Sequence, residues 1–242
     1  MALAIIISTL TAEKIATKYF SFKKDTIIDL APYVIILGII GARIYYCVLN
    51  YDFYLRFPTE ILALRHGGIS IHGAILGGII GLLLYSYKRK IQVAKLADIS
   101  AFGLVLGQSI GRWGNFFNSE AFGLPTNLPW KLYIAPQYRP VPYENYEYFH
   151  PTFLYESIAS FIIFLILLLL LKQNKFLKSG NIALIYLILY STIRILTESL
   201  RLDSVAYING IPVAMAVSFG IIILASILLV MNNFFINRKA RQ

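Results

Sequence analysis

The segment Phe161-Ile-Ile-Phe-Leu-Ile-Leu-Leu-Leu-Leu-Leu171 consists of eleven consecutive apolar residues. With its neighbours it forms an apolar stretch over residues 153–171 that contains one charged side chain, Glu156. A helix that crosses the roughly 30 Å hydrocarbon core of a membrane needs about 20 mostly apolar residues. This stretch meets that need, and five others meet or approach it: 31–49, 69–87, 94–111, 181–200 and 211–231. We therefore predict an all-α fold, a polytopic membrane helix bundle with six full transmembrane helices.

The residues from Met1 to Leu10 are apolar but too few to span a membrane. No basic residue precedes them and no small-residue cleavage site clearly follows, so a secretory signal is not indicated. We interpret them as the remainder of a seventh helix. Residues 1–242 are then a single integral membrane domain.

The composition excludes several other classes of protein. Of the 242 residues 58% are hydrophobic and 14% charged, whereas globular chains are about 25% charged. The net charge of +10 does not predict a nucleic-acid partner, because the basic residues lie in short groups between apolar runs. Cys47 is the only cysteine, and no Cys/His spacing resembles a zinc site. We expect no internal disulfide, no metal and no cofactor.

The basic residues also predict sidedness, since lysine and arginine mark cytoplasmic loops. Fourteen of the 22 fall in residues 11–30, 88–95, 172–180 and the C-terminal tail, and only six in the intervening loops. The C-terminus is therefore expected in the cytoplasm.

The loop over 112–152 is expected on the outside, as an irregular cap on the outer leaflet. It holds six of the nine prolines, which prevent a continuous helix. It also carries Trp130 and five tyrosines, which favour the membrane-water boundary: Tyr133, Tyr138, Tyr143, Tyr146 and Tyr148.

Charged side chains within a bilayer cost about 2.5–3.5 kcal/mol each on insertion scales, so those in the predicted spans call for an explanation. The topology brings Arg43, His72, Arg112 and Arg194 to the outer half of the membrane. Spacings of four and three place Arg194, Glu198 and Arg201 on one helical stripe. Converging arginines form an oxyanion site, and the abundant oxyanion at this depth is a phospholipid phosphodiester. A histidine can accept a proton there, and asparagines can orient a head group.

Each of these residues has a simpler alternative explanation. Arg194 and Glu198 alone are consistent with an intrahelical ion pair, and Arg43 and Arg112 with arginines that snorkel to water. His66 and His72 suit hydrogen-bonded interhelical histidines, and His150 the end of a loop. Tyr155 and Glu156 suit interfacial anchors. Glycines 67, 68, 73, 77, 78 and 81 suit close helix packing.

Four ordered motifs carry a resemblance to a known family. They are His66-Gly-Gly-Ile-Ser-Ile-His72-Gly, Gly111-Arg-Trp-Gly-Asn115-Phe-Phe-Asn118-Ser-Glu120-Ala-Phe-Gly123, His150-Pro-Thr-Phe-Leu-Tyr155-Glu156 and Tyr190-Ser-Thr-Ile-Arg194-Ile-Leu-Thr-Glu198-Ser-Leu-Arg201-Leu-Asp203. From about residue 31 to the last helix, the chain resembles the bacterial prolipoprotein diacylglyceryl transferases.

The resemblance implies an enzyme of the bacterial cytoplasmic membrane with its active site towards the outer leaflet. It implies transfer of the diacylglyceryl group of phosphatidylglycerol to the lipobox cysteine thiol of a preprolipoprotein signal peptide, which forms a thioether and releases glycerol 1-phosphate. Arg112 and Arg194 match the arginines that bind the lipid and its phosphate, and His72 is our choice of base. The matching binding and supporting residues are Asn115, Glu120, Gly123, Tyr190 and Glu198, and we expect support also from Arg43, Asn118, His150, Tyr155, Glu156 and Arg201.

One departure concerns the beginning of the chain. The family's first transmembrane helix carries a tyrosine that is important for activity, whereas Met1 to Leu10 supplies only about 15 Å of helix. We expect a start assigned too late or a shortened chain, with weak or no activity.

Other functions stay open at this point. An anion or lipid transporter would use the same Arg/His cluster, but it predicts polar residues on both halves of the path. A lipid-binding scaffold explains the arginines and not the histidine and glutamates. A lipoprotein precursor is not indicated, because Tyr45-Tyr46 precedes Cys47 where a small residue is required. The motifs of other phospholipid enzymes are not found.

Overall fold

The computed structural model describes residues 1–173, 178–202, 207–208 and 210–239, with side chains at all of these except 208 and 235–239. The chain divides into two compact units: an N-terminal unit, Thr9–Ala97, and a C-terminal unit, which combines Met1–Ser8 with Asp98–Gln242. Six helices are long and apolar enough to cross a membrane, counted over the described residues. The chain is a multi-pass membrane protein, as predicted.

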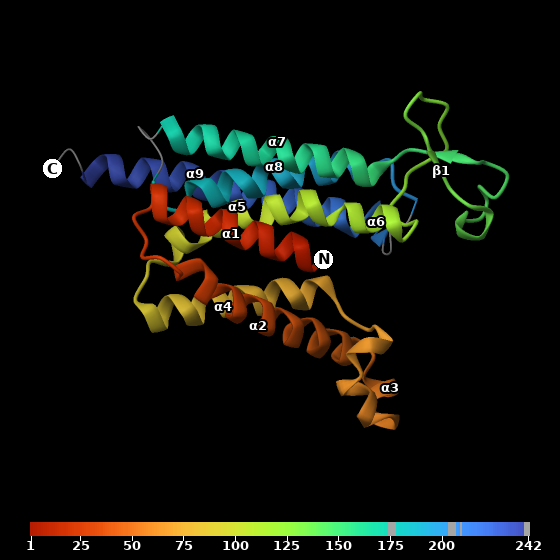
Figure 1. Ribbon diagram of the computed structural model, residues 1–242, viewed down its shortest axis with the longest axis horizontal. Coiled ribbons are helices and arrows are strands. Elements are labelled where there is room, and N and C mark those ends of the chain that lie inside the picture. Colours follow the sequence, from red (N-terminus) through yellow and green to blue (C-terminus); the bar gives the residue numbers. More distant parts are fainter. Residues whose placement is uncertain (174–177, 203–206, 209, 240–242) are drawn as a thin grey trace. The chain divides into compact units, whose positions relative to one another are not determined.

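The N-terminal unit consists mainly of α2 (Thr26–Leu49) and α4 (Ile71–Arg89), which lie side by side (Figure 1). Most of α1 (Ala2–Tyr19) also belongs to it. The buried Glu13 of α1 accepts hydrogen bonds from the backbone N–H groups of Asp25 and Ile27, both at 2.8 Å. A carboxylate at this place stabilises the helix N-terminus of α2, where N–H groups lack intrahelical partners. The segment that connects α2 to α4 in the chain contains α3 (Tyr51–Arg56) and the 3₁₀ helices η1 (Pro58–Leu62) and η2 (Leu64–His66).

Glycine determines how closely α2 and α4 approach. A Cβ atom at Gly73 would lie 2.2 Å from the carbonyl oxygen of Gly41, and one at Gly77 would lie 2.0 Å from that of Leu37. A Cβ atom at Gly81 would lie 2.5 Å from the carbonyl oxygen of Tyr33. The prediction of close packing is thus confirmed for 73, 77 and 81, a small-xxx-small pattern. It is wrong for Gly67 and Gly68, which lie outside the helices and have φ angles of 83° and 72°, where glycine is favoured.

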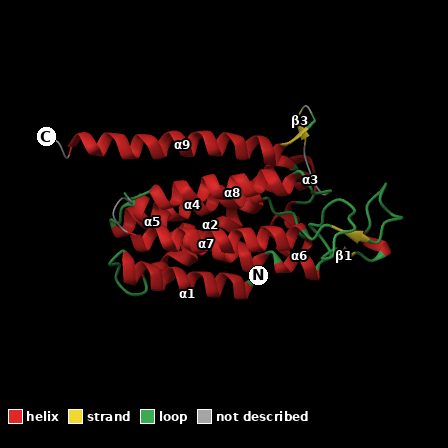
Figure 2. Ribbon diagram, turned by 90° about the horizontal axis from the view of Figure 1, so that it is seen from above, coloured by secondary structure: helices red, strands yellow, loops and turns green. Residues whose placement is uncertain are grey.

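The C-terminal unit is formed by α5 (Val93–Gly111), from Asp98 on, together with α6 (Trp113–Phe117), α7 (Thr152–Gln173), α8 (Asn181–Glu198) and α9 (Val213–Lys239). The chain packs α8 against both α7 and α9 (Figure 2). Ser109 of α5 and Ser157 of α7 exchange hydrogen bonds, each hydroxyl donating to the other's carbonyl oxygen at 2.9 and 2.7 Å. These buried pairs hold the two helices in register.

Asp98 provides a second cap between helices. Its carboxylate accepts the N–H groups of Gly180 at 2.6 Å and Ala183 at 2.9 Å, at the N-terminus of α8. Glu13 and Asp98 therefore have the same structural task in different units.

The cap is irregular, as predicted, but contains two short strands that the sequence did not indicate. β1 (Leu132–Tyr133) pairs antiparallel with β2 (Tyr148–Phe149), with the 3₁₀ helix η3 (Pro136–Tyr138) between them. Phe122, Ile134 and Phe149 form a buried apolar cluster that holds the cap together. A further short pair, β3 (Tyr207–Ile208) and β4 (Ile211–Pro212), precedes α9.

Three helix boundaries differ from the prediction by five residues or more, and one of them is the end of α9, which lies at Lys239 and not at residue 231. The first helix extends beyond Leu10 to Tyr19, and α2 begins at Thr26, ahead of residue 31. The polar residues Glu13, Lys14 and Lys18 concealed the continuation of α1, because an apolar length criterion counts them against a helix. The bonds from Glu13 explain the early start of α2, since they stabilise its first turn.

Candidate functional site

A single carboxylate, that of Glu156 in the second turn of α7, gathers three arginines. Its Oε2 pairs with the guanidinium of Arg112, which follows α5 directly. Its Oε1 receives NH1 of Arg194 from α8 and NH1 of Arg201, both at 3.3 Å. These residues, with Glu198, are called the arginine cluster below. Residues from three parts of the chain thus meet at one point, as the sequence predicts for Arg112, Arg194 and Arg201.

Arg194 also pairs with Glu198, one turn further along α8, at 2.5 Å. The intrahelical ion pair considered above therefore exists, but it is part of a larger network. The helical stripe predicted for Arg201 is wrong, because α8 ends at Glu198. Arg201 reaches Glu156 from the turn after the helix, where its backbone bridges to Gly123.

Burial differs between the two signs of charge in the cluster. The side chains of Glu156 and Glu198 are each 3% exposed, whereas those of Arg112 and Arg194 are 20% exposed and that of Arg201 is 12% exposed. Arg112 does not snorkel alone to water, since a buried carboxylate holds it. The side chains of Arg112 and Arg194 thus stay partly exposed, and each guanidinium has five N–H donors. The cluster can therefore receive a further anion.

Gly123 connects the cap to the arginine cluster. Its N–H donates to the carbonyl oxygen of His150 at 2.8 Å, and the next residue donates to that of Leu200 at 2.8 Å. A Cβ atom at position 123 would lie 2.6 Å from the oxygen of Leu200 and 2.9 Å from Thr152. Only glycine fits here without displacing the turn that carries Arg201.

The polar turn after α6 presents the predicted residues Asn118 and Glu120 at the surface. The side-chain amide of Asn118 donates to Glu120 at 3.2 Å, and the backbone of Glu120 donates to Asn115 at 3.0 Å. Ser119 and Ala121 have φ angles of 54° and 55°, which non-glycine residues seldom adopt. Such strained positions cluster at functional sites.

A hydrogen-bonded chain joins the cap to the start of α7. The indole N–H of Trp130 donates to the Tyr155 hydroxyl at 2.8 Å, and that hydroxyl lies 3.1 Å from Nδ1 of His150. The hydroxyl of Tyr155 thus accepts a hydrogen bond from Trp130 and also pairs with His150. Neither His150 nor Tyr155 is therefore only a loop end or an anchor. Sequence reasoning counted Trp130 only as an interfacial aromatic residue, because its hydrogen-bond partner is 25 residues away.

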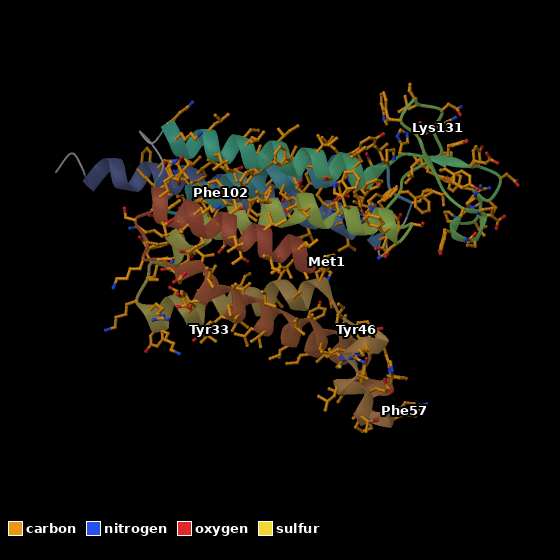
Figure 3. All side chains as sticks on the ribbon, viewed as in Figure 1. Met1, Tyr33, Tyr46, Phe57, Phe102 and Lys131 are labelled. Carbon is orange, nitrogen blue, oxygen red and sulfur yellow. The ribbon has the colours of Figure 1, made fainter. Side chains whose placement is uncertain are left out.

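Two further aromatic contacts of the C-terminal unit involve Tyr190 in α8 and Tyr148 in the cap. The ring of Tyr190 stacks on that of Tyr186 with centroids 5.9 Å apart. In the cap, Lys131 lies over the Tyr148 ring with Nζ 4.1 Å from its centroid (Figure 3). Asp203, the last residue of the fourth motif, lies outside the described residues.

Arg43 of the N-terminal unit has a different environment. It is buried, so the snorkelling alternative is wrong. Its ring partner is Tyr54, 5.2 Å away, and burial raises the pKa of the Tyr54 phenol, which stays neutral. The guanidinium donates only to backbone carbonyl groups of the loop between α3 and α4: Glu60, Ile61, Ala63, Gly67 and Gly68. All of its nitrogens are engaged, so Arg43 orders this loop and is not free to bind phosphate.

The two other histidines also belong to the N-terminal unit. His72 is exposed in the first turn of α4, with its ring 5.9 Å from that of Tyr45. His66 carries a salt bridge from Nδ1 to Glu60 at 2.9 Å and lines a hollow of about 360 Å³ beside Tyr46 and Tyr54. His66 is therefore not an interhelical histidine but part of the loop that Arg43 orders. Among the described residues, no group of three or more His, Cys, Asp or Glu side chains can hold a metal ion.

Comparison with known proteins gives consistent findings. The sequence model of one family, described as prolipoprotein diacylglyceryl transferase, matches residues 1–231. A phosphatidylglycerol–prolipoprotein diacylglyceryl transferase of Thermosynechococcus vestitus is 42% identical over 226 residues, which cover 93% of this chain and 84% of the relative. Proteins of the same name from Acaryochloris marina and Synechococcus elongatus are 47% and 48% identical, and cover 84% and 82% of this chain and 74% and 71% of their own lengths.

Proposed function

Since this chain belongs to the prolipoprotein diacylglyceryl transferase family, it is a transferase, and we propose that its arginine cluster carries out the phosphate-binding part of the reaction. The proposed substrates are phosphatidylglycerol and the lipobox cysteine of a preprolipoprotein signal peptide. The thiol sulfur attacks a saturated glycerol carbon, the bond from that carbon to the phosphate oxygen breaks, and glycerol 1-phosphate leaves. The product is a thioether-linked diacylglyceryl group.

The observation that supports this function best is the tethering of Arg112 and Arg194 to Glu156. A guanidinium binds phosphate oxygens through two parallel N–H bonds and stays charged. Two such groups with exposed edges suit the phosphodiester of the lipid. They also suit the leaving phosphate, whose negative charge grows in the transition state.

The proton of the thiol is assigned to His72. A thiol has a pKa near 8.5, so only a small fraction is thiolate at neutral pH and a base raises the rate. His72 is exposed, and an unprotonated imidazole nitrogen can accept the proton. The reaction needs no oxyanion hole for an acyl carbonyl, because the attacked carbon is saturated.

Head-group recognition is assigned to the polar turn after α6 and to its neighbours. Asn118 and Glu120 are exposed and already paired, so they offer an amide and a carboxylate to the hydroxyl groups of a glycerol head group. Asn115, Tyr190 and Glu198 are proposed to complete this surface. Gly123, His150, Tyr155 and Arg201 hold the cap and the cluster together.

We further propose that the protein lies in the bacterial cytoplasmic membrane with its C-terminus in the cytoplasm. Within the C-terminal unit, Arg112, Glu156 and Glu198 lie at the helix ends next to the cap, and Lys172 and Lys178 lie at the opposite ends. Figure 1 shows the cap strand β1 and the C-terminal end of α9 at opposite ends of this unit. This arrangement agrees with an active site towards the outer leaflet.

A transporter is less well supported. It needs polar groups along the whole path, and the acidic residue at the other end of α5 is Asp98. Its two carboxylate oxygens cap the N-terminus of α8, which is a structural task.

Thioether formation by the purified full chain, with phosphatidylglycerol and a lipobox peptide, tests the proposal. We expect Arg112→Ala and Arg194→Ala to lower the rate by roughly a hundredfold to a thousandfold each, as loss of a transition-state donor does. Leu169→Ala on the exposed face of α7 is the matched control and should keep its activity. Unchanged rates in both arginine variants would rule out this assignment.

A further inference from the structure

Glu156 uses both of its carboxylate oxygens to pair with three arginines, which is more than the anchoring of one arginine requires. Its two oxygens are shared between guanidinium groups from different parts of the chain, Oε2 with Arg112 and Oε1 with Arg194 and Arg201. One anion therefore holds the guanidinium groups of Arg112 and Arg194 close together. Each has five N–H donors and both side chains are partly exposed, so a second anion can bind beside them.

The position of that second anion follows from burial. Glu156 is 3% exposed and lies on the inner side of the guanidinium groups, whereas Arg112 and Arg194 are 20% exposed. An anion on the exposed edges is thus separated from the carboxylate by little more than a planar guanidinium, roughly 6 Å. At that distance in a protein, like charges repel appreciably.

This repulsion grows with the charge of the ligand. Every charge on a bound phosphate meets the attraction of the arginines and the repulsion of Glu156. We propose that Glu156 is a specificity-determining residue, which reduces the preference of the arginine cluster for a doubly charged phosphomonoester over a singly charged phosphodiester. This inference rests on the proposed function and defines the class of anion that the site takes.

The reaction gives this preference a role in turnover. The substrate phosphodiester carries one negative charge. When sulfur displaces it from carbon, the electron pair of the broken C–O bond stays on the phosphate oxygen, and the thiol proton goes to the base. The leaving glycerol phosphate then has two charges above the second pKa of a phosphomonoester, about 6. Glu156 therefore weakens binding of the product more than that of the substrate, and assists release.

Calorimetric binding of two probes to the full chain tests the proposal without turnover. Glycerol 1-phosphate changes from one charge at pH 5 to two at pH 8, whereas its methyl diester keeps one charge. For Glu156→Gln, which keeps the shape and removes the charge, we expect glycerol 1-phosphate to bind roughly tenfold to a hundredfold more tightly than to the wild type at pH 8. The gain should be smaller at pH 5 and for the diester.

The titratable and charged groups that face Glu156 are Arg112, Arg194, Arg201 and Glu198, and the diester reports on any of their own pH effects. Glu156→Asp keeps the charge and should keep the wild-type ratio of the affinities for the two probes. An equal gain for both probes, or none, would overturn the proposal.

If Glu156→Gln does not fold, binding of the two probes to the wild type at pH 5 and pH 8 still tests the proposal. The affinity of the wild type for glycerol 1-phosphate relative to the diester should rise by less than about tenfold from pH 5 to pH 8, and a larger rise would refute the inference. Thioether formation by the wild type is a separate measurement, so its result bears on the proposed function and leaves these binding results interpretable.

Discussion

Arg43 and Arg112 both follow apolar helical residues, but the protein uses them in opposite ways. Arg43 donates to backbone carbonyl groups of one loop and has no nitrogen left for a ligand. Arg112 pairs with the buried Glu156 and keeps an exposed edge. The environment, and not the residue type or its place in a span, separates a structural arginine from a binding arginine.

The largest expected effects come from replacing each of these two arginines by lysine. Arg112→Lys should lower the rate of thioether formation by about a hundredfold with little change in thermal unfolding, because lysine keeps the charge and loses the bidentate geometry. Arg43→Lys should lower the free energy of unfolding by roughly 2–4 kcal/mol, because buried carbonyl groups lose their donors. Activity per folded molecule should change far less in Arg43→Lys. Similar profiles for the two variants would remove the distinction between these sites.

Glu156→Ala tests how far the arginine cluster depends on its carboxylate. It leaves Arg112, Arg194 and Arg201 without their common partner, and breaking a buried ion pair by removing one side typically destabilises by about 3–5 kcal/mol. Scanning calorimetry in detergent measures the change. A loss below about 1 kcal/mol would show that the arginines have equivalent partners elsewhere.

Gly77→Ala and Gly78→Ala sharpen the comparison within the N-terminal unit. A Cβ atom at Gly77 would lie 2.0 Å from the Leu37 oxygen, whereas one at Gly78 would make an ordinary 3.5 Å contact with Val34. We expect Gly77→Ala to destabilise by roughly 1–3 kcal/mol and Gly78→Ala to be nearly neutral. Equal melting temperatures would argue against the close approach of α2 and α4.

Trp130→Phe should give the smallest effect. It removes one hydrogen bond to the Tyr155 hydroxyl and keeps an aromatic ring, a change of about 1 kcal/mol. Hydrogen exchange of the cap should rise near residue 130 and stay unchanged in α9. No increase there would mean that the bond does not hold the cap to α7.

The membrane helices could be predicted from sequence because apolar length is a local property. The six spans and the irregular cap follow directly from runs of residues such as 153–171 and from the prolines of 112–152. The length of α1 could not, since its continuation carries Glu13 and two lysines whose partners lie elsewhere in the chain. Helix caps between distant residues leave no local signal.

The members of the candidate site could be predicted, but not their arrangement. The motifs contain Arg112, Arg194, Arg201 and Glu156, yet Arg201 and Glu156 were counted only as supporting residues. One signal existed, because Glu156 is the only charged residue of its apolar stretch. The engagement of Arg43 depends on five carbonyl groups of a folded loop, and no sequence pattern reports backbone carbonyl positions.

Equilibrium binding of phosphatidylglycerol, measured without peptide so that no turnover occurs, tests the central assignment most directly. Purified wild type should be compared with the double variant Arg112→Gln/Arg194→Gln, after thermal unfolding has shown both to be folded. Loss of two charge-assisted contacts should weaken binding by roughly a hundredfold or more. Equal affinity of the two proteins would contradict the account, because the lipid phosphate would then bind elsewhere.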